Sequence, residues 1–371
     1  MPRGGWHAQR RAVFRTLLPE RRLDILPGPG PYTPAAARQP VIRDPEMASA
    51  NANSQGFLPG GRVIPAGFLF AIAAGALWGT TGPLSTALYA EGSQLTDVGF
   101  WRVLVATAGF TLFGLARPSI FRADRRALLL VLGAGGLLVA VFEVAFQYAI
   151  AGVGVAAAVA LLYTAPVIVA VLARLMLGEA LTPARLAMAV VVMLGVGLTV
   201  NGALVEDTIP AAAGRREWVV GVVGGLLAAA SYAGTTLLAR FAVPRYGAVR
   251  VLFLELVGGT LFLAAFLPAS GRVPVPPPSP AAWLYVMALG AGAVLAANFC
   301  FFAAVRRIDA APTAVAASVE PVVGALLALA LFDQRLTAAG WLGLLMVVGG
   351  VGGGYLLEAV AQRMPGRRAA R

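Results

Sequence analysis

Glu320 and Pro321 lie at the centre of an apolar segment that runs from residue 310 to 332. This segment is long enough to cross a bilayer, since about 20 apolar residues suffice. A carboxylate at that depth is costly to bury, so it marks a candidate functional site. Glu320 could bind and release a proton there, or it could bond backbone groups that Pro321 leaves without a partner. Both interpretations turn its side chain toward protein or water rather than lipid.

Other charged and amide side chains also fall inside apolar segments. Arg102 and Glu143 lie at compatible depths toward the outer ends of their segments, where an ion pair would lower the cost of both charges. A snorkelling arginine, or a pair that only supports packing, is the alternative. Gln147 follows Glu143 by about one helical turn and shares its face. Asn298 and Glu255 complete the set, although Glu255 could instead face lipid headgroups near a segment end.

Aromatic side chains within these segments could line a substrate cavity, because ring faces stack on substrates and attract cations. Proline removes a backbone hydrogen bond and can kink a helix where a cavity is needed. The aromatic candidates are Trp78, Tyr148, Tyr163 and Tyr232, and the helix-kink candidates are Pro166 and Pro321.

The elements that must position these residues predict an all-α integral membrane protein. The chain of 371 residues is 59% hydrophobic and 12% charged, whereas soluble domains are about 25% charged. Ten apolar segments have the length of transmembrane helices. They are residues 66–90, 98–116, 127–149, 152–173, 186–204, 218–239, 249–267, 282–304, 310–332 and 339–357.

Composition also restricts cofactors and partners. The net charge of +12 comes from arginines that lie almost entirely between apolar segments, where they set topology rather than bind nucleic acid. Cys300 is the single cysteine, and the single histidine, His7, lies outside every apolar segment. We therefore expect no metal, no haem or other cofactor, and no membrane-embedded enzyme mechanism.

Both ends of the chain are predicted to be basic tails. Residues 1–62 are rich in Arg, Pro and Gly and have no helical period, which is typical of disordered sequence. This tail could bind anionic lipid, or Met47 could be the true start of translation. Residues 359–371 form the second tail, which we expect in the cytoplasm.

The two halves of the membrane region repeat each other at an offset of 155 residues. We expect one five-helix repeat over residues 66–204 and another over residues 218–358. The aligned positions include Pro166 with Pro321, Leu181 with Leu336, Gly195 with Gly350, and Glu143 with Asn298.

The distribution of arginine predicts the orientation of these repeats. With a cytoplasmic amino terminus, the cytoplasmic segments carry fifteen Arg beyond residues 1–62, and the outer loops carry four. Because five spans is an odd number, the second repeat would enter the membrane inverted, and both termini would be cytoplasmic. Inverted repeats are typical of alternating-access transporters, which bind substrate between the repeats near mid-bilayer.

Several short motifs follow one another in a fixed order through the membrane region. They include Leu77-Trp78-Gly79, Arg102, Tyr163-Thr164-Ala165-Pro166, Gly178-Glu179-Ala180-Leu181-Thr182, Ser231-Tyr232-Ala233 and Glu320-Pro321. Over about residues 66–358 the chain resembles the drug/metabolite transporter superfamily, specifically EamA proteins with two five-helix repeats. That resemblance implies a ten-helix transporter of the inner membrane, of a kind that often exports amino acids, other metabolites or amphipathic toxic compounds, without one fixed substrate. Asp333-Gln334-Arg335-Leu336-Thr337 departs from the pattern, because it lacks the Glu of the first copy.

The predicted function is transport of a small molecule across the plasma membrane by alternating access. The substrate would be an amino acid, a related metabolite or an amphipathic drug-like compound. Efflux in exchange for protons is the leading hypothesis, and substrate-gradient exchange or uptake is the alternative. A channel or a structural membrane protein is a further alternative. Membrane lipid is an expected partner, and a homodimer is compatible with the sequence.

Overall fold

The computed structural model describes residues 66–177, 183–203, 215–308 and 310–363. Within these ranges every regular element is helical. The tail 1–62 with Met47, the motif at 178–182 and residues 364–371 lie outside the described residues.

The first half of the chain forms five helical segments joined by short connections. Its elements are α3 (Ala66–Gly79), α4 (Thr81–Ala90), α5 (Leu95–Ala116), the 3-10 turn η1 (Pro118–Phe121), the π-helix η2 (Ala127–Gly135), α6 (Gly136–Val153), α7 (Val155–Leu162), α8 (Ala165–Leu177) and α9 (Pro183–Gly202). α3 runs into α4, η2 into α6, and α7 into α8, so each of these pairs makes one segment.

The second half repeats this plan. Its elements are α10 (Arg215–Tyr246), α11 (Ala248–Ala269), α12 (Pro280–Met287), the π-helix η3 (Ala288–Ala296), α13 (Ala297–Val305), α14 (Ala310–Ala317), α15 (Glu320–Phe332) and α16 (Ala338–Arg363). A π-helix lies in the third segment of each half, and π-helical turns often occur at functional sites.

In the described residues each of the ten predicted segments is built mainly of helix, and the all-α membrane class is confirmed. Eight helical segments are long and apolar enough to cross a membrane, and two more contain shorter apolar stretches, Leu186–Gly202 and Ala338–Gly354. The count of ten crossings therefore stays a prediction. α16 ends at Arg363, so the helix enters the range expected to be the carboxyl-terminal tail.

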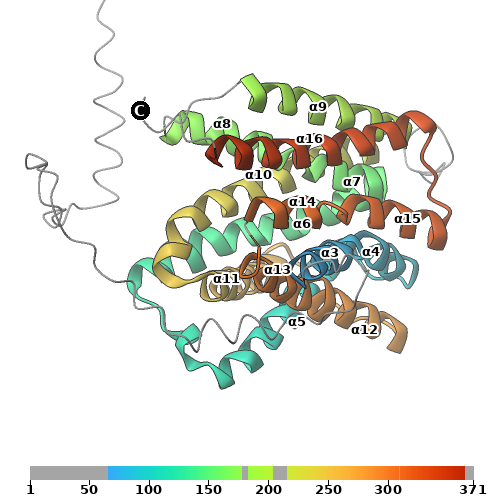
Figure 1. Cartoon of the computed structure of the whole chain (residues 1–371). Helices are drawn as coiled ribbons and strands as arrows, with labels where there is room; N and C mark the ends of the chain where they lie inside the picture. Colours follow the sequence, from blue (N-terminus) through green and yellow to red (C-terminus); the bar gives the residue numbers. More distant parts are fainter. Residues whose placement is uncertain (1–65, 178–182, 204–214, 309, 364–371) are drawn as a thin grey trace, which may run out of the picture. The chain divides into compact units, whose positions relative to one another are not determined.

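The two halves pack against each other reciprocally (Figure 1). α6 of the first half contacts α10 and α11 of the second half. In return, α13 of the second half contacts α3, and η3 contacts α5. α9 and α16, the last helices of the halves, lie side by side. Each third segment therefore inserts between the first two segments of the other half, which is the pattern that two related halves would give.

Glycine permits the close contact between α9 and α16. A methyl group added at Gly195 would lie 2.7 Å from the carbonyl oxygen of Gly343, so the two backbones leave no room for a side chain. Helices in lipid gain little from hydrophobic burial against each other, and small residues let them associate through close backbone packing.

Candidate functional site

A cavity of about 400 Å³ lies among helices of both halves. Small-molecule sites commonly have volumes of roughly 300–1,000 Å³, so a metabolite-sized ligand would fit. Most of the predicted site residues line this cavity: Trp78, Arg102, Glu143, Tyr163, Pro166, Tyr232, Glu255, Asn298 and Glu320.

Two interrupted helices meet at the cavity. Tyr163 and Thr164 separate α7 from α8, and Ser318 and Val319 separate α14 from α15. The 155-residue offset maps one interruption onto the other. Transporters commonly place substrate and ion sites at such discontinuous helices near mid-bilayer.

Local hydroxyl groups bond the backbone at both interruptions. Thr164 Oγ1 donates a hydrogen bond of 2.7 Å to the carbonyl of Leu161, and Ser318 Oγ donates one of 2.6 Å to the carbonyl of Val315. Non-helical backbone is tolerated at membrane depth where its polar groups are bonded and it borders a cavity. The breaks are therefore compatible with a membrane location.

Pro166 and Pro321 are the second residues of α8 and α15. In a first helical turn the missing proline N–H costs nothing, because that group would have no partner within the helix. The prolines thus stand just after two breaks rather than inside two continuous helices. Pro166 lines the cavity, whereas Pro321 is buried outside its lining. That the prolines cause the breaks stays a prediction.

A hydrogen bond connects the two interruptions directly. The Tyr163 hydroxyl donates to Glu320 Oε2 across 3.2 Å. Glu320 is the first residue of α15 and is partly buried on the cavity lining. The bond therefore joins the first half of the chain to the acid of the second half, at the point where both helices are broken.

Arg102 and Glu143 form an ion pair on the cavity lining. Arg102 Nη1 lies 3.2 Å from Glu143 Oε2, and the two residues are 6% and 3% exposed. Among the described residues, no group bonds the buried Nε of Arg102. The arginine is thus enclosed by protein and does not snorkel to the membrane surface.

Gln147 and Tyr148 do not line the cavity. Gln147 is fully buried, and its Oε1 accepts a hydrogen bond from the Tyr89 hydroxyl. Tyr148 is exposed on the outside of α6, which corrects the expectation that it faces the cavity. Phe142, Glu143 and Phe146 define the cavity face of α6, and position 148 is about half a turn away from Phe146.

The remaining aromatic candidates belong to two ring contacts on the cavity wall. Trp78 packs on Phe301 with ring centroids 5.3 Å apart, and Tyr232 packs on Phe142 with centroids 6.2 Å apart. All four rings belong to residues that line the cavity. Such rings suit a ligand with an aromatic or aliphatic body.

Asn298 and Glu255 supply hydrogen-bond acceptors. Asn298 Nδ2 donates a hydrogen bond of 2.8 Å to the carbonyl of Val294. The amide oxygen of Asn298 can therefore accept a hydrogen bond from another donor. Glu255 is 7% exposed and lines the cavity, so it does not face lipid headgroups. In the residues that the structure describes, no cluster of His, Cys, Asp and Glu could hold a metal ion.

Sequence comparison places both halves in one family. The model of the EamA-like transporter family matches residues 65–201 and again residues 219–353. The chain belongs to the EamA-like transporter family. No curated protein matches it. One solved structure, described simply as the crystal structure of a protein, covers 80% of this chain and 99% of its own, with 22% sequence identity and a TM-score of 0.56. That likeness supports the fold alone.

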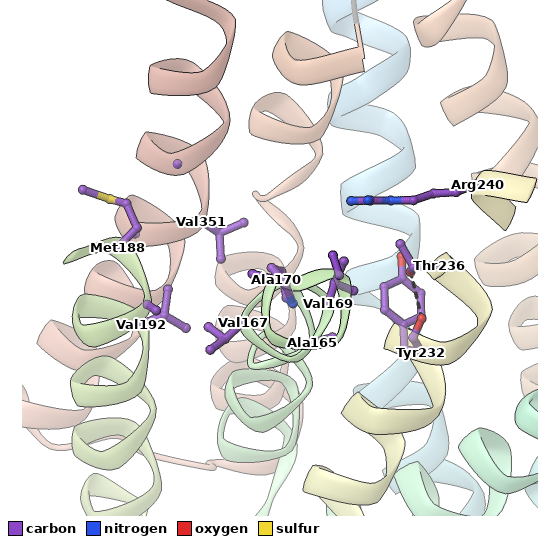
Figure 2. A pocket seen from close by; sticks show the side chains of 15 residues that line it. Ala165, Val167, Val169, Ala170, Met188, Val192, Tyr232, Thr236, Arg240 and Val351 are labelled. Carbon is purple, nitrogen blue, oxygen red and sulfur yellow. Dashed lines mark hydrogen bonds between the residues drawn. The ribbon is translucent and has the colours of Figure 1, made fainter. Parts of the chain in front are cut away.

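The two EamA repeats build a second, smaller cavity beside the first. It has a volume of about 260 Å³ and lies among α8, α9, α10 and α16 (Figure 2). Its wall is mostly apolar, with Met188 and Val192 on α9 and Arg240 on α10. Tyr232, Pro166, Ala165 and Val351 line both cavities, so the two spaces adjoin.

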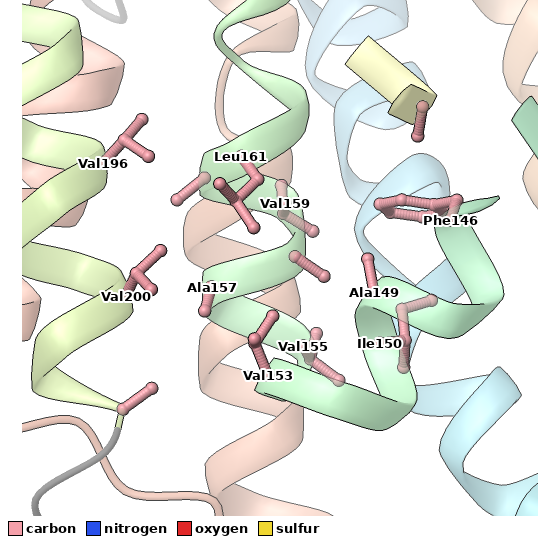
Figure 3. Close-up of a cluster of buried hydrophobic side chains, with 14 of the residues drawn as sticks. Phe146, Ala149, Ile150, Val153, Val155, Ala157, Val159, Leu161, Val196 and Val200 are labelled. Atoms are coloured by element: carbon pink, nitrogen blue, oxygen red, sulfur yellow. The ribbon is translucent and has the colours of Figure 1, made fainter. Parts of the chain in front are cut away.

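A buried apolar core holds α7 in place between α6 and α9 of the first EamA repeat (Figure 3). The core contains Phe146, Ile150, Leu161 and Val200. Gly154 joins α6 to α7 with a φ of 79°, a conformation that glycine adopts without strain. The interrupted helix is therefore anchored on its α7 side.

Gln334 makes a contact between the two halves that the sequence did not reveal. Its Oε1 accepts a hydrogen bond of 3.1 Å from the backbone N–H of Val155, where α7 begins. The 155-residue offset aligns it with Glu179, so the departure from the family pattern retains a side-chain acceptor in the second copy. The same offset aligns Ser318 with Tyr163, a signal that could have identified Ser318 as a cavity residue.

Proposed function

We propose that this EamA protein is a secondary transporter that exports a small metabolite or an amphipathic drug-like compound across the plasma membrane in exchange for protons. The observation that carries the proposal is the Tyr163–Glu320 hydrogen bond between the two interrupted helices, on the lining of the central cavity. An acid in this position contacts both repeats and the substrate space at once.

In the proposed cycle, Glu320 binds a proton from one side of the membrane and releases it to the other. The ionised carboxylate accepts a hydrogen bond from the Tyr163 hydroxyl and so links the first repeat to the second. Protonation removes the charge that strengthens this bond, which favours movement of one repeat against the other. Binding of substrate and of the proton would then alternate, because both use the same cavity.

We further propose that ten helices cross the membrane and that the two repeats are inverted, with both termini in the cytoplasm. The arginine distribution supports this orientation, and the reciprocal packing of the halves supports their relation as repeats. Reporter fusions at residue 210 and at the carboxyl end should report opposite sides of the membrane. Reporters on the same side would exclude inverted repeats.

Trans-stimulation in proteoliposomes tests the transport function. A thermal-shift screen against amino acids, sugars, nucleotides and organic cations first selects a ligand, because a compound that binds the native state raises its stability. Unlabelled ligand inside the vesicles should then accelerate entry of the radiolabelled ligand. Acceleration requires a carrier with alternating access, whereas a channel would equilibrate the label without it.

A further inference from the structure

Glu255 is a buried acid for which the described part of the chain offers no partner. Glu255 is 7% exposed, and its Oε1 is buried without a hydrogen bond. An ionised carboxylate removed from water needs a counter-charge or hydrogen bonds, or it must take up a proton. The proposed proton exchange at Glu320 does not use Glu255.

The immediate surroundings of Glu255 are apolar. A methyl group built at Gly135, the last residue of η2, would lie 2.9 Å from Glu255 Cγ and 2.9 Å from Leu238 Cδ2, so these groups pack tightly together. Leu252 lies one helical turn before Glu255 and Leu256 directly follows it, and both leucines also line the cavity. None of these neighbours can neutralise the charge.

The charges on the cavity lining do not balance. Its charged residues are Arg102, Glu143, Glu255 and Glu320. Arg102 is paired with Glu143, which leaves two carboxylates without a cationic partner on this lining. Arg240 belongs to the adjoining cavity. An anionic ligand would therefore meet an excess of negative charge, whereas a cation would compensate it.

The rest of the lining also suits a cation. The amide oxygen of Asn298 can accept a hydrogen bond from an ammonium group, since its amide nitrogen already donates to Val294. Trp78, Phe142 and Tyr232 also line the cavity, and aromatic rings attract cations.

We propose that the central cavity takes organic cations with an apolar body, and that the Glu255 carboxylate is the counter-ion of the substrate's ammonium group. This inference deepens the proposed transport function and rests on it. It assigns separate roles to the two carboxylates: Glu320 carries the proton, and Glu255 binds the positive charge of the substrate. Zwitterions are disfavoured, because a substrate carboxylate would add to the negative charge of this lining, where the charge of Arg102 is already neutralised by Glu143.

Three probes with a similar aromatic body and different charge test this inference. Binding of phenethylamine, phenylalanine and 3-phenylpropionate to the purified full-length chain is measured by calorimetry and thermal shift. Phenethylamine should bind more tightly than the other two. Glu255→Gln should weaken its binding by about 10- to 100-fold, the cost of losing a hydrogen bond to a charged group. Glu91→Gln, at an exposed acid outside the cavity, should bind like the parent.

The melting temperature of ligand-free Glu255→Gln shows whether the variant is folded. Glu255→Asp keeps the charge and should retain part of the affinity for phenethylamine. Equal binding of phenethylamine by the parent and the Gln variant would overturn the inference, and so would preferred binding of the anion or no binding of the cation. Trans-stimulation is scored separately. Cation binding that depends on Glu255 without trans-stimulation would refute transport while leaving the cation site intact.

Discussion

Replacing Glu320 with glutamine is expected to leave substrate binding intact and to abolish the response of transport to a pH gradient. Glutamine keeps the size of the side chain and can still accept a hydrogen bond from the Tyr163 hydroxyl. It cannot bind and release a proton. In proteoliposomes with a gradient of about one pH unit, one-for-one exchange in the parent would concentrate substrate about tenfold. The variant should approach equal concentrations on both sides.

Two further variants separate proton transfer from structural effects. Glu217→Gln alters an exposed acid in the first turn of α10 and should behave like the parent. Tyr163→Phe removes the hydroxyl that bonds Glu320 but keeps the titratable acid, so pH-driven transport should persist at a changed rate. If the Glu320→Gln variant responds to the pH gradient as the parent does, the proton-carrier role is wrong. Glu143 then becomes the next candidate.

Much of the site could be predicted because membrane burial makes polar residues conspicuous. A charge inside an apolar segment is costly wherever it lies, so Glu320, Arg102 and Glu143 stood out without any knowledge of their neighbours. The 155-residue repeat likewise relates the two interrupted helices. The family match to both halves confirms that the chain contains two EamA repeats.

Contacts between distant helices could not be predicted in the same way. Nothing local in the sequence indicates that Tyr163 bonds Glu320 or that Gln334 bonds the start of α7, because these contacts depend on how the two halves pack. Tyr148 was misplaced because the cavity side of α6 is set by its neighbours α10 and α11. Hydrophobic periodicity does not reveal that side in a helix that is apolar all round.

The second large effect is expected at the buried ion pair. Arg102→Met should destabilise the protein by about 3–5 kcal/mol, since it leaves the Glu143 carboxylate buried without its cation. Glu143→Leu should also destabilise it, because the guanidinium would lose its bond from Nη1 while its Nε already lacks one. Unfolding of the purified variants in detergent, followed by intrinsic fluorescence, measures both losses.

The double variant Arg102→Met with Glu143→Leu separates the value of the pair from the penalty of an unpaired charge. Replacing both partners by apolar groups of similar size removes the uncompensated charge, so the double variant should regain much of the stability that each single variant loses. Equal melting of Arg102→Met and the parent would contradict the prediction, and would mean that water or a proton already compensates Glu143. A stable double variant that no longer transports would instead show that the charges of the pair are needed for transport and not for the fold.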